Sequence, residues 1–160
     1  MTATPDIPVI AVARRTATDD LSRLIHEIMP LINASMSRGV ETRVVHGSCL
    51  QGSGFCTRPA AIQQILLNLA MNADAAMPHG GDLLIETRRE PDSIRIIVAD
   101  TGTGLSDDAL QRIFEPFYTT RPSWGLGLCI VRTLIDELGG TIRVHSEMGH
   151  GTTFQIDLPV

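Results

Sequence analysis

The feature that most constrains this chain is an acidic residue at the end of an apolar run. Residues 94–99 read Ile-Arg-Ile-Ile-Val-Ala, which is typical of a buried strand, and Asp-Thr-Gly-Thr-Gly follows at residues 100–104 as a glycine-rich turn. A carboxylate beside a core is costly unless a donor hydrogen-bonds to it. Asp100 therefore either forms only a turn, in which Gly102 and Gly104 adopt positive φ, or accepts a hydrogen bond from a ligand amino group such as that of adenine.

Helical and strand patterns alternate along the rest of the chain. Three long helices are expected, over residues 19–37, from residue 57 or 58 until before Pro78, and over residues 125–138, with a short helix between Ser106 and residue 113. Strands are expected over residues 40–46, 82–88, 93–99, 141–146 and 152–158, with one more short strand at residues 9–13. Because strands occur in adjacent pairs, the sequence predicts an α/β (α+β) fold: a two-layer sandwich with a mixed five- to six-stranded sheet and three long helices on one face.

The first helix has an apolar face interrupted by a proline. Its expected buried residues recur at helical spacing and are Leu21, Leu24, Ile25, Ile28, Leu31 and Ile32. Pro30 lies inside this pattern and is expected to kink or split the helix, because proline lacks a backbone N–H and its ring clashes with the preceding turn.

Composition limits the classes of partner and the compartment. The 160 residues carry a net charge of −5, which argues against binding along a nucleic-acid backbone. No signal peptide or membrane span is evident, so no direct membrane contact is expected and any anchor of a parent protein lies outside this chain. Cys49 and Cys56 are near enough in sequence to pair, but an odd count of three cysteines without a secretory signal favours reduced thiols in the cytoplasm.

Two asparagines lie four residues apart on the second helix. Asn68 and Asn72 therefore share one face, beside the apolar stripe, although asparagine is a mediocre helix former. Hydrogen bonds to a neighbouring loop are one explanation. The other is that their side-chain oxygens serve a hard cation such as Mg²⁺, together with phosphate oxygens.

Two further stretches each allow a structural and a functional interpretation. Gly125-Leu-Gly-Leu128 begins the third long helix, where glycines either let helix and sheet pack closely or let N–H groups approach a phosphate. Phe114 and Phe117 flank Glu-Pro and form either a buried anchor under a loop or the hinge of a flap over a ligand.

The order of these motifs resembles the GHKL ATPase superfamily, and within it the catalytic ATP-binding (HATPase_c) domain of sensor histidine kinases. Residues 64–73, with Asn68 and Asn72, resemble the asparagine box; residues 100–104 the first glycine box; residues 114–117 the phenylalanine box; and residues 125–128 the second glycine box. The resemblance covers about residues 19–159 and implies a Bergerat-type ATP-binding fold. Residues 1–18 are expected to be a flexible tail or linker remnant, and residues 19–160 the domain.

The resemblance implies roles for individual residues. Asp100 would accept the adenine amino group, Asn72 would bind Mg²⁺ with Asn68 on the phosphate side, and Thr152 would reach adenine through water. Residues 115–124 would form a short ATP lid, from which Arg121 would contact the γ-phosphate unless it is only a solvated loop cation. The nucleotide-contacting residues implied in this way are Asn68, Asn72, Asp100, Gly102, Gly104, Leu105, Phe117, Thr120, Gly125, Leu126, Gly127, Leu128 and Thr152.

The residue at position 68 separates two activities. Hydrolytic members of the superfamily usually carry a glutamate there as general base, and the neutral amide of Asn68 cannot take a proton. The expected activity is therefore phosphoryl transfer from ATP·Mg²⁺ to a histidine on a separate helical-hairpin domain, and through it to a response regulator. His26 is rejected as the acceptor because it lies within the first helix of the domain itself, and the isolated domain is expected to be a monomer.

Departures from the family pattern keep alternatives open. Ser123 and Trp124 precede Gly125 where another glycine is usual, and Asp74 follows the asparagine box where a lysine is frequent. The alternatives are a degenerate module that docks a response regulator, a true ATPase, and an anti-sigma-type serine kinase.

Overall fold

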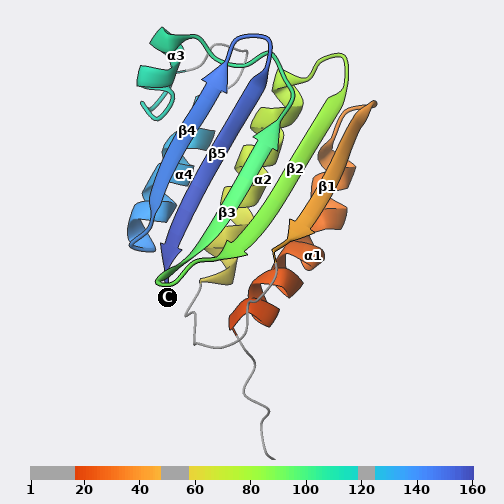
Figure 1. The fold of residues 1–160 in the computed structure, drawn as a ribbon. Coiled ribbons are helices and arrows are strands. Elements are labelled where there is room, and N and C mark those ends of the chain that lie inside the picture. Colours follow the sequence, from red (N-terminus) through yellow and green to blue (C-terminus); the bar gives the residue numbers. More distant parts are fainter. Residues whose placement is uncertain (1–16, 48–57, 119–124) are drawn as a thin grey trace, which may run out of the picture.

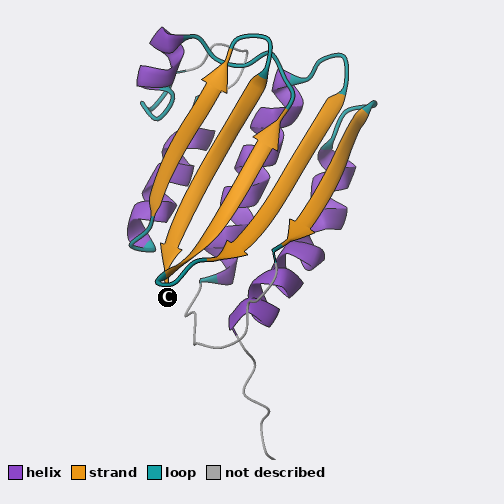
Figure 2. Ribbon diagram, viewed as in Figure 1, coloured by secondary structure: helices purple, strands orange, loops and turns teal. Residues whose placement is uncertain are grey.

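The computed structural model describes residues 17–47, 58–118 and 125–160, which form one sheet with its long helices on one face (Figures 1 and 2). The elements in chain order are α1 (Ala17–Ser35), β1 (Val40–His46), α2 (Pro59–Ala76), β2 (Gly81–Arg89), β3 (Ser93–Asp100), α3 (Asp107–Arg112), α4 (Gly127–Glu137), β4 (Thr141–Glu147) and β5 (Gly151–Pro159). Helices α1, α2 and α4 cover the sheet, while the short α3 lies beyond one end of it. The predicted two-layer architecture is confirmed.

The sheet is mixed, as predicted. Its strand order is β1-β2-β3-β5-β4, in which β1 and β2 run parallel and every other neighbouring pair is antiparallel. The parallel pair is joined through α2, which crosses the helical face of the sheet. The described residues contain five strands, and the short strand expected at residues 9–13 lies outside them.

The core lies between α2 and the sheet. Ile62, Ile65, Leu66 and Leu69 of α2 are at most 1% exposed, and they pack with the alternate, inward-facing residues of β2, β3 and β5. Each such side chain contributes about 1.5–3 kcal/mol through burial. This packing fixes α2 over the middle of the sheet and so fixes the positions of Asn68 and Asn72, which are part of this helix.

Helix α1 departs from the sequence prediction at two neighbouring residues. It is not split at Pro30, and Leu31, expected in the core, is 55% exposed. Pro30 itself is exposed, whereas Ile28 and Ile32 on either side of it are buried at 4% and 0% exposure. Their burial offsets the roughly 3 kcal/mol that an internal proline costs a helix.

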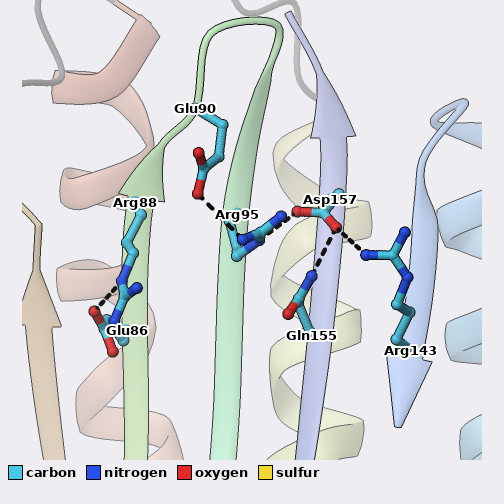
Figure 3. Close-up of polar contacts among 7 residues, drawn as sticks. All are labelled: Glu86, Arg88, Glu90, Arg95, Arg143, Gln155 and Asp157. Atoms are coloured by element: carbon cyan, nitrogen blue, oxygen red, sulfur yellow. Dashed lines mark hydrogen bonds and ion pairs between the residues drawn. The ribbon is translucent and has the colours of Figure 1, made fainter.

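The opposite face of the sheet carries a charged network (Figure 3). Arg95 lies between Glu90 and Asp157, at N–O distances of 3.2 and 2.7 Å, and Gln155 and Arg143 also contact the Asp157 carboxylate. Partial burial would raise the pKa of Asp157, but the hydrogen bonds from Arg95 and Gln155 outweigh it and lower that pKa. The network makes this face of the sheet polar, in contrast to the apolar face that packs against the helices.

No helix among residues 17–47, 58–118 and 125–160 is long and apolar enough to cross a membrane.

Candidate functional site

A cavity of about 930 Å³ opens between α2, α4 and the ends of β3 and β5. It is lined by Asn68, Met71, Asn72, Ala75, Ala76, Pro78, Asp100, Thr103, Leu105, Ala109, Ile113, Tyr118, Gly125, Leu126, Gly127, Leu128, Ile130, Thr152 and Phe154. Most of the wall is apolar, and a few polar groups converge on it, which is typical of a small-molecule site. Residues from three separate motifs of the sequence meet here: the asparagine pair of α2, Asp100 at the end of β3 and the stretch Gly125–Leu128, together with Thr152 of β5.

Asp100 lies at the end of β3, where the strand reaches the cavity. Its Oδ1 accepts a hydrogen bond from the Gly102 backbone N–H at 2.8 Å, which fixes the orientation of the carboxylate. In the sheet, Asp100 is directly opposite Thr152 of β5, and Thr152 is only 6% exposed. The turn interpretation and the ligand interpretation of Asp100 are therefore compatible, since the same carboxylate caps the turn and lines the cavity.

The glycines after Asp100 are required by close packing. A Cβ on Gly102 would lie 2.6 Å from Ala76 of α2, and Gly104 has φ +67° and passes so near the Glu147 carbonyl that a Cβ would lie 2.0 Å from its oxygen. Neither glycine lines the cavity. They hold the loop between α2 and the β4–β5 turn, and Thr103 and Leu105 of this loop line the cavity.

The two asparagines of α2 face the start of α4. A Cβ built on Gly127 would lie 3.5 Å from Asn68 Oδ1 and 4.0 Å from Asn72 Nδ2. Leu126 at the N-cap position has an apolar side chain, so it cannot accept a hydrogen bond from the N–H groups of the first turn. These N–H groups and the side-chain amides thus face each other across one end of the cavity, which suits an anion.

The second glycine box begins the helix two residues later than predicted. Gly125 has φ +66°, a conformation that does not belong to a right-handed helix, and α4 starts at Gly127. The Gly125 carbonyl accepts a hydrogen bond from the Phe117 N–H at 3.0 Å. This bond joins the two chain segments on either side of residues 119–124.

The two phenylalanines behave differently from each other. Phe114 is half-buried and packs against the core, with the Arg132 guanidinium 5.8 Å from its ring centroid. Phe117 is 73% exposed, so its expected place as a buried anchor is wrong. It does not line the cavity in this structure, and its contact with a nucleotide stays a prediction. Tyr118 lines the cavity instead. Thr120, Arg121, Ser123, Trp124, Cys49 and Cys56 lie outside the described residues.

Several cavity residues that were not predicted lie at helical spacing from the two asparagines of α2. Met71, Ala75 and Ala76 lie three or four residues from Asn68 and Asn72 on α2, and all of them line the cavity. Tyr118 and Ile130 also line the cavity, but their spacing in the sequence does not predict this, because only tertiary packing brings them to the cavity wall.

The oxygen atoms in the cavity wall suit a metal ion that is held jointly by the protein and by a bound ligand. Among the described residues, no three His, Cys, Asp or Glu side chains are grouped to hold a metal ion. Amide oxygens such as those of Asn68 and Asn72 are hard ligands, of the kind that Mg²⁺ combines with phosphate oxygens and water.

A family model matches residues 57–160, and its description is "Histidine kinase-, DNA gyrase B-, and HSP90-like ATPase". The matched region extends from the beginning of α2 to the end of β5 and includes every wall of the cavity.

Individual proteins are similar over most of the chain. Sensor kinase CckA of Brucella abortus is 35% identical over 158 residues, covering 88% of this chain and 16% of CckA. The structure of full-length ShkA in complex with AMPPNP is 32% identical with a TM-score of 0.78, covering 88% of this chain and 30% of ShkA. The catalytic domain of histidine kinase ThkA is 28% identical with a TM-score of 0.74, covering 87% of this chain and 91% of that domain. The chain thus spans less than a third of CckA and of ShkA.

Proposed function

The chain belongs to the family of histidine kinase-, DNA gyrase B- and HSP90-like ATPases, and we propose that it is the ATP-binding catalytic domain of a sensor histidine kinase. In this proposal it transfers the γ-phosphate of ATP to a histidine on a separate helical-hairpin domain. The proposed domain includes the whole of α1 and so begins at residue 17 rather than 19, while residues 1–16 of the expected tail or linker lie outside the described residues. The proposal rests on one arrangement: a strand-end carboxylate at one side of the cavity and two amides facing a glycine-started helix at the other.

Asp100 and Thr152 define the base end of the cavity. Their positions on adjacent strands make the base end rigid, and a carboxylate accepts hydrogen bonds without donating any at neutral pH. An exocyclic amine is therefore the matching ligand group, which favours adenine over a base with a carbonyl at that position. Leu105 and Phe154 supply apolar wall beside it.

Asn68, Asn72 and Gly127 define the phosphate end. The first-turn N–H groups of α4 and the helix dipole favour an anion there, and Gly125, Leu126 and Leu128 line the same end. Asn72 would hold Mg²⁺ through its side-chain oxygen with Asn68 beside the phosphates. When bound, Mg²⁺ supplies charge neutralisation between phosphate oxygens. In the proposal, Thr120 and Arg121 contact the nucleotide from the lid.

Transfer to a protein is favoured over hydrolysis by the residue at position 68. An amide accepts no proton at neutral pH, so Asn68 leaves a water molecule without the general base that a carboxylate would provide. Transfer of a phosphoryl group needs mainly positioning and charge neutralisation, which the amides and the start of α4 provide. The similarity to sensor kinases likewise favours this function over a response-regulator docking module or an anti-sigma-type serine kinase.

The acceptor histidine is proposed to lie outside this chain. His26 is on α1, which packs beside α2 and contributes no residue to the cavity wall. A helical-hairpin domain of the parent kinase would bring the acceptor to the open end of the cavity, and a response regulator would take the phosphoryl group from it.

The test is nucleotide binding by Asp100→Asn, which keeps the shape of the side chain and an oxygen for the Gly102 N–H. Asn has one N–H₂ group where the carboxylate had an acceptor, so ADP affinity in the presence of Mg²⁺ should fall by about 10- to 100-fold, the value of a charge-assisted hydrogen bond. Isothermal titration calorimetry measures the affinity for ADP of both proteins. Asp92→Asn, an exposed carboxylate in the β2–β3 turn, is the matched control and should bind ADP like the parent.

Phosphoryl transfer is tested separately. The domain is mixed with ATP, Mg²⁺ and the hairpin domain of the parent kinase, and acid-labile phosphohistidine on the hairpin is measured. Unchanged ADP affinity in Asp100→Asn contradicts the adenine assignment. Steady phosphate release without the hairpin, and no phosphohistidine with it, identifies an ATPase instead.

A further inference from the structure

Ser146 of β4 makes three polar contacts beside the base end of the cavity, although sequence analysis assigned it no role. Its Oγ accepts a hydrogen bond from the Leu105 N–H at 2.8 Å, donates one to the Gly151 carbonyl at 2.9 Å, and lies 2.9 Å from Thr152 Oγ1. Sheet register places Ser146 opposite Thr152, and Thr152 opposite Asp100, so the three side chains form one row across β4, β5 and β3.

Counting hydrogens determines the direction of the third contact. A serine hydroxyl has one hydrogen, and Ser146 gives it to the Gly151 carbonyl. Its contact with Thr152 must therefore use a lone pair of Ser146, and the Thr152 hydroxyl must be the donor. The hydrogen of Thr152 is then directed at Ser146, so Thr152 can act toward the cavity only as an acceptor, through the lone pairs of its oxygen.

We propose that Ser146 is a positioning residue for base recognition: it sets Thr152 as a hydrogen-bond acceptor and, through Leu105, anchors the loop that follows Asp100. This inference rests on the proposed nucleotide function. Because Thr152 is opposite Asp100, the base end presents two acceptors side by side. The amine of a base can donate hydrogen bonds to these two acceptors. The carbonyl oxygen of a base cannot, because it is itself an acceptor. A water molecule between Thr152 and the base must likewise donate one hydrogen to Thr152.

In this proposal, the preference for an adenine nucleotide depends on Ser146, although Ser146 need not contact the nucleotide. Without the Ser146 hydroxyl, Thr152 is free to rotate and to donate its hydrogen to a carbonyl oxygen. Removing Ser146 should therefore weaken the binding of an adenine nucleotide more than that of a hypoxanthine nucleotide, which has a carbonyl in place of the amine. A purely structural role would weaken both equally.

The experiment measures the ratio of ADP to IDP affinity in the presence of Mg²⁺ for the parent chain and for four variants. Ser146→Ala should lower the ratio by about three- to tenfold, the value of one hydrogen bond. Ser146→Thr keeps the hydroxyl and should restore the ratio. Thr152→Val keeps the shape of Thr152 without an acceptor and should lower the ratio by a similar factor, and adding Ser146→Ala to Thr152→Val should lower it no further.

Thermal unfolding of each variant shows whether it is folded, since Ser146→Ala leaves the Leu105 N–H and the Gly151 carbonyl without the serine hydroxyl. If Ser146→Ala does not fold, Thr152→Val decides: equal loss of ADP and IDP overturns the proposal. A parent-like ratio in folded Ser146→Ala, or a further fall in the double variant, also overturns it. Failure of the parent chain to bind ADP would instead overturn the proposed function.

Discussion

Replacing Gly127 with alanine should raise the stability of the domain and lower its affinity for nucleotide. Gly127 is the first residue of α4 and is not among the glycines with positive φ. The added Cβ would meet nothing nearer than Asn68 Oδ1 at 3.5 Å, which is ordinary van der Waals contact. Alanine is favoured over glycine by up to about 1 kcal/mol inside a helix and by less in its first turn, so a gain of about 0.5 kcal/mol is expected. For a domain of this size that gain raises Tm by roughly 1–2 °C.

The same methyl group changes the phosphate end of the cavity. It would occupy the space between the start of α4 and Asn68, and 3.5 Å leaves no room for a phosphate oxygen between the Cβ and Asn68 Oδ1. A phosphate must then move away from the first-turn N–H groups or from the amides. Losing one charge-assisted hydrogen bond of about 1.5 kcal/mol weakens ADP binding by roughly tenfold.

The assay pairs thermal unfolding without nucleotide with isothermal titration of ADP in the presence of Mg²⁺. Thr133→Ala is the matched control, because Thr133 is an exposed residue of the same helix, bonds only to the Cys129 carbonyl among the contacts described, and does not line the cavity. It should stabilise α4 slightly and leave ADP affinity unchanged. If Gly127→Ala binds ADP within twofold of the parent, phosphate does not approach the chain at this position and the assignment of the phosphate end is refuted.

Two more predictions concern stability. The pKa of Asp157 is lowered in the folded chain, so its contribution to the free energy of unfolding is complete above the unfolded-state pKa of about 3.9 and is lost as pH falls through the lower folded pKa. In urea unfolding, the stability difference between the parent and Asp157→Asn should therefore shrink below about pH 4. A difference independent of pH would contradict the ion-pair network. Gly104→Ala combines a positive φ with a Cβ 2.0 Å from the Glu147 carbonyl oxygen and should lower the free energy of unfolding by about 2 kcal/mol or more. Gly149→Ala, with φ +80° in open space, should lower it by only about 1 kcal/mol. Equal losses of stability would argue against the close approach of Gly104 to the Glu147 carbonyl.

The sheet could be predicted from the sequence because its strands alternate regularly. Val40–His46 has the predicted bounds, and the other four strands differ by at most one residue at each end. Helix ends were less predictable. The pattern of the sequence predicts a helix from Gly125, but the positive φ of this residue excludes it from the helix. Because glycine adopts either sign of φ, the neighbouring segment decides which one it takes.

The candidate site was predictable where its residues carry a local signal. Asp100 follows an apolar strand, and Asn68 and Asn72 share a helical face, so their positions in the sequence alone predict that they belong to a site. Leu31 and Phe117 show the opposite case. Both are apolar residues in an apolar context, yet they are 55% and 73% exposed, because burial depends on which surfaces the sheet and the other helices happen to cover.

The base end and the phosphate end of the cavity have different structural supports. Asp100, Thr152 and Ser146 form a row across three hydrogen-bonded strands, so the base end can shift only if the sheet does. The phosphate end is made by α2 and by the start of α4, where the Phe117–Gly125 hydrogen bond joins the chain on either side of residues 119–124. A change at the base end should therefore alter which base is preferred, whereas a change at Asn68 or Gly127 should weaken the binding of the phosphates without altering that preference. The two kinds of variant are expected to be additive in binding, because the base end is built on strands β3, β5 and β4 and the phosphate end on α2 and α4.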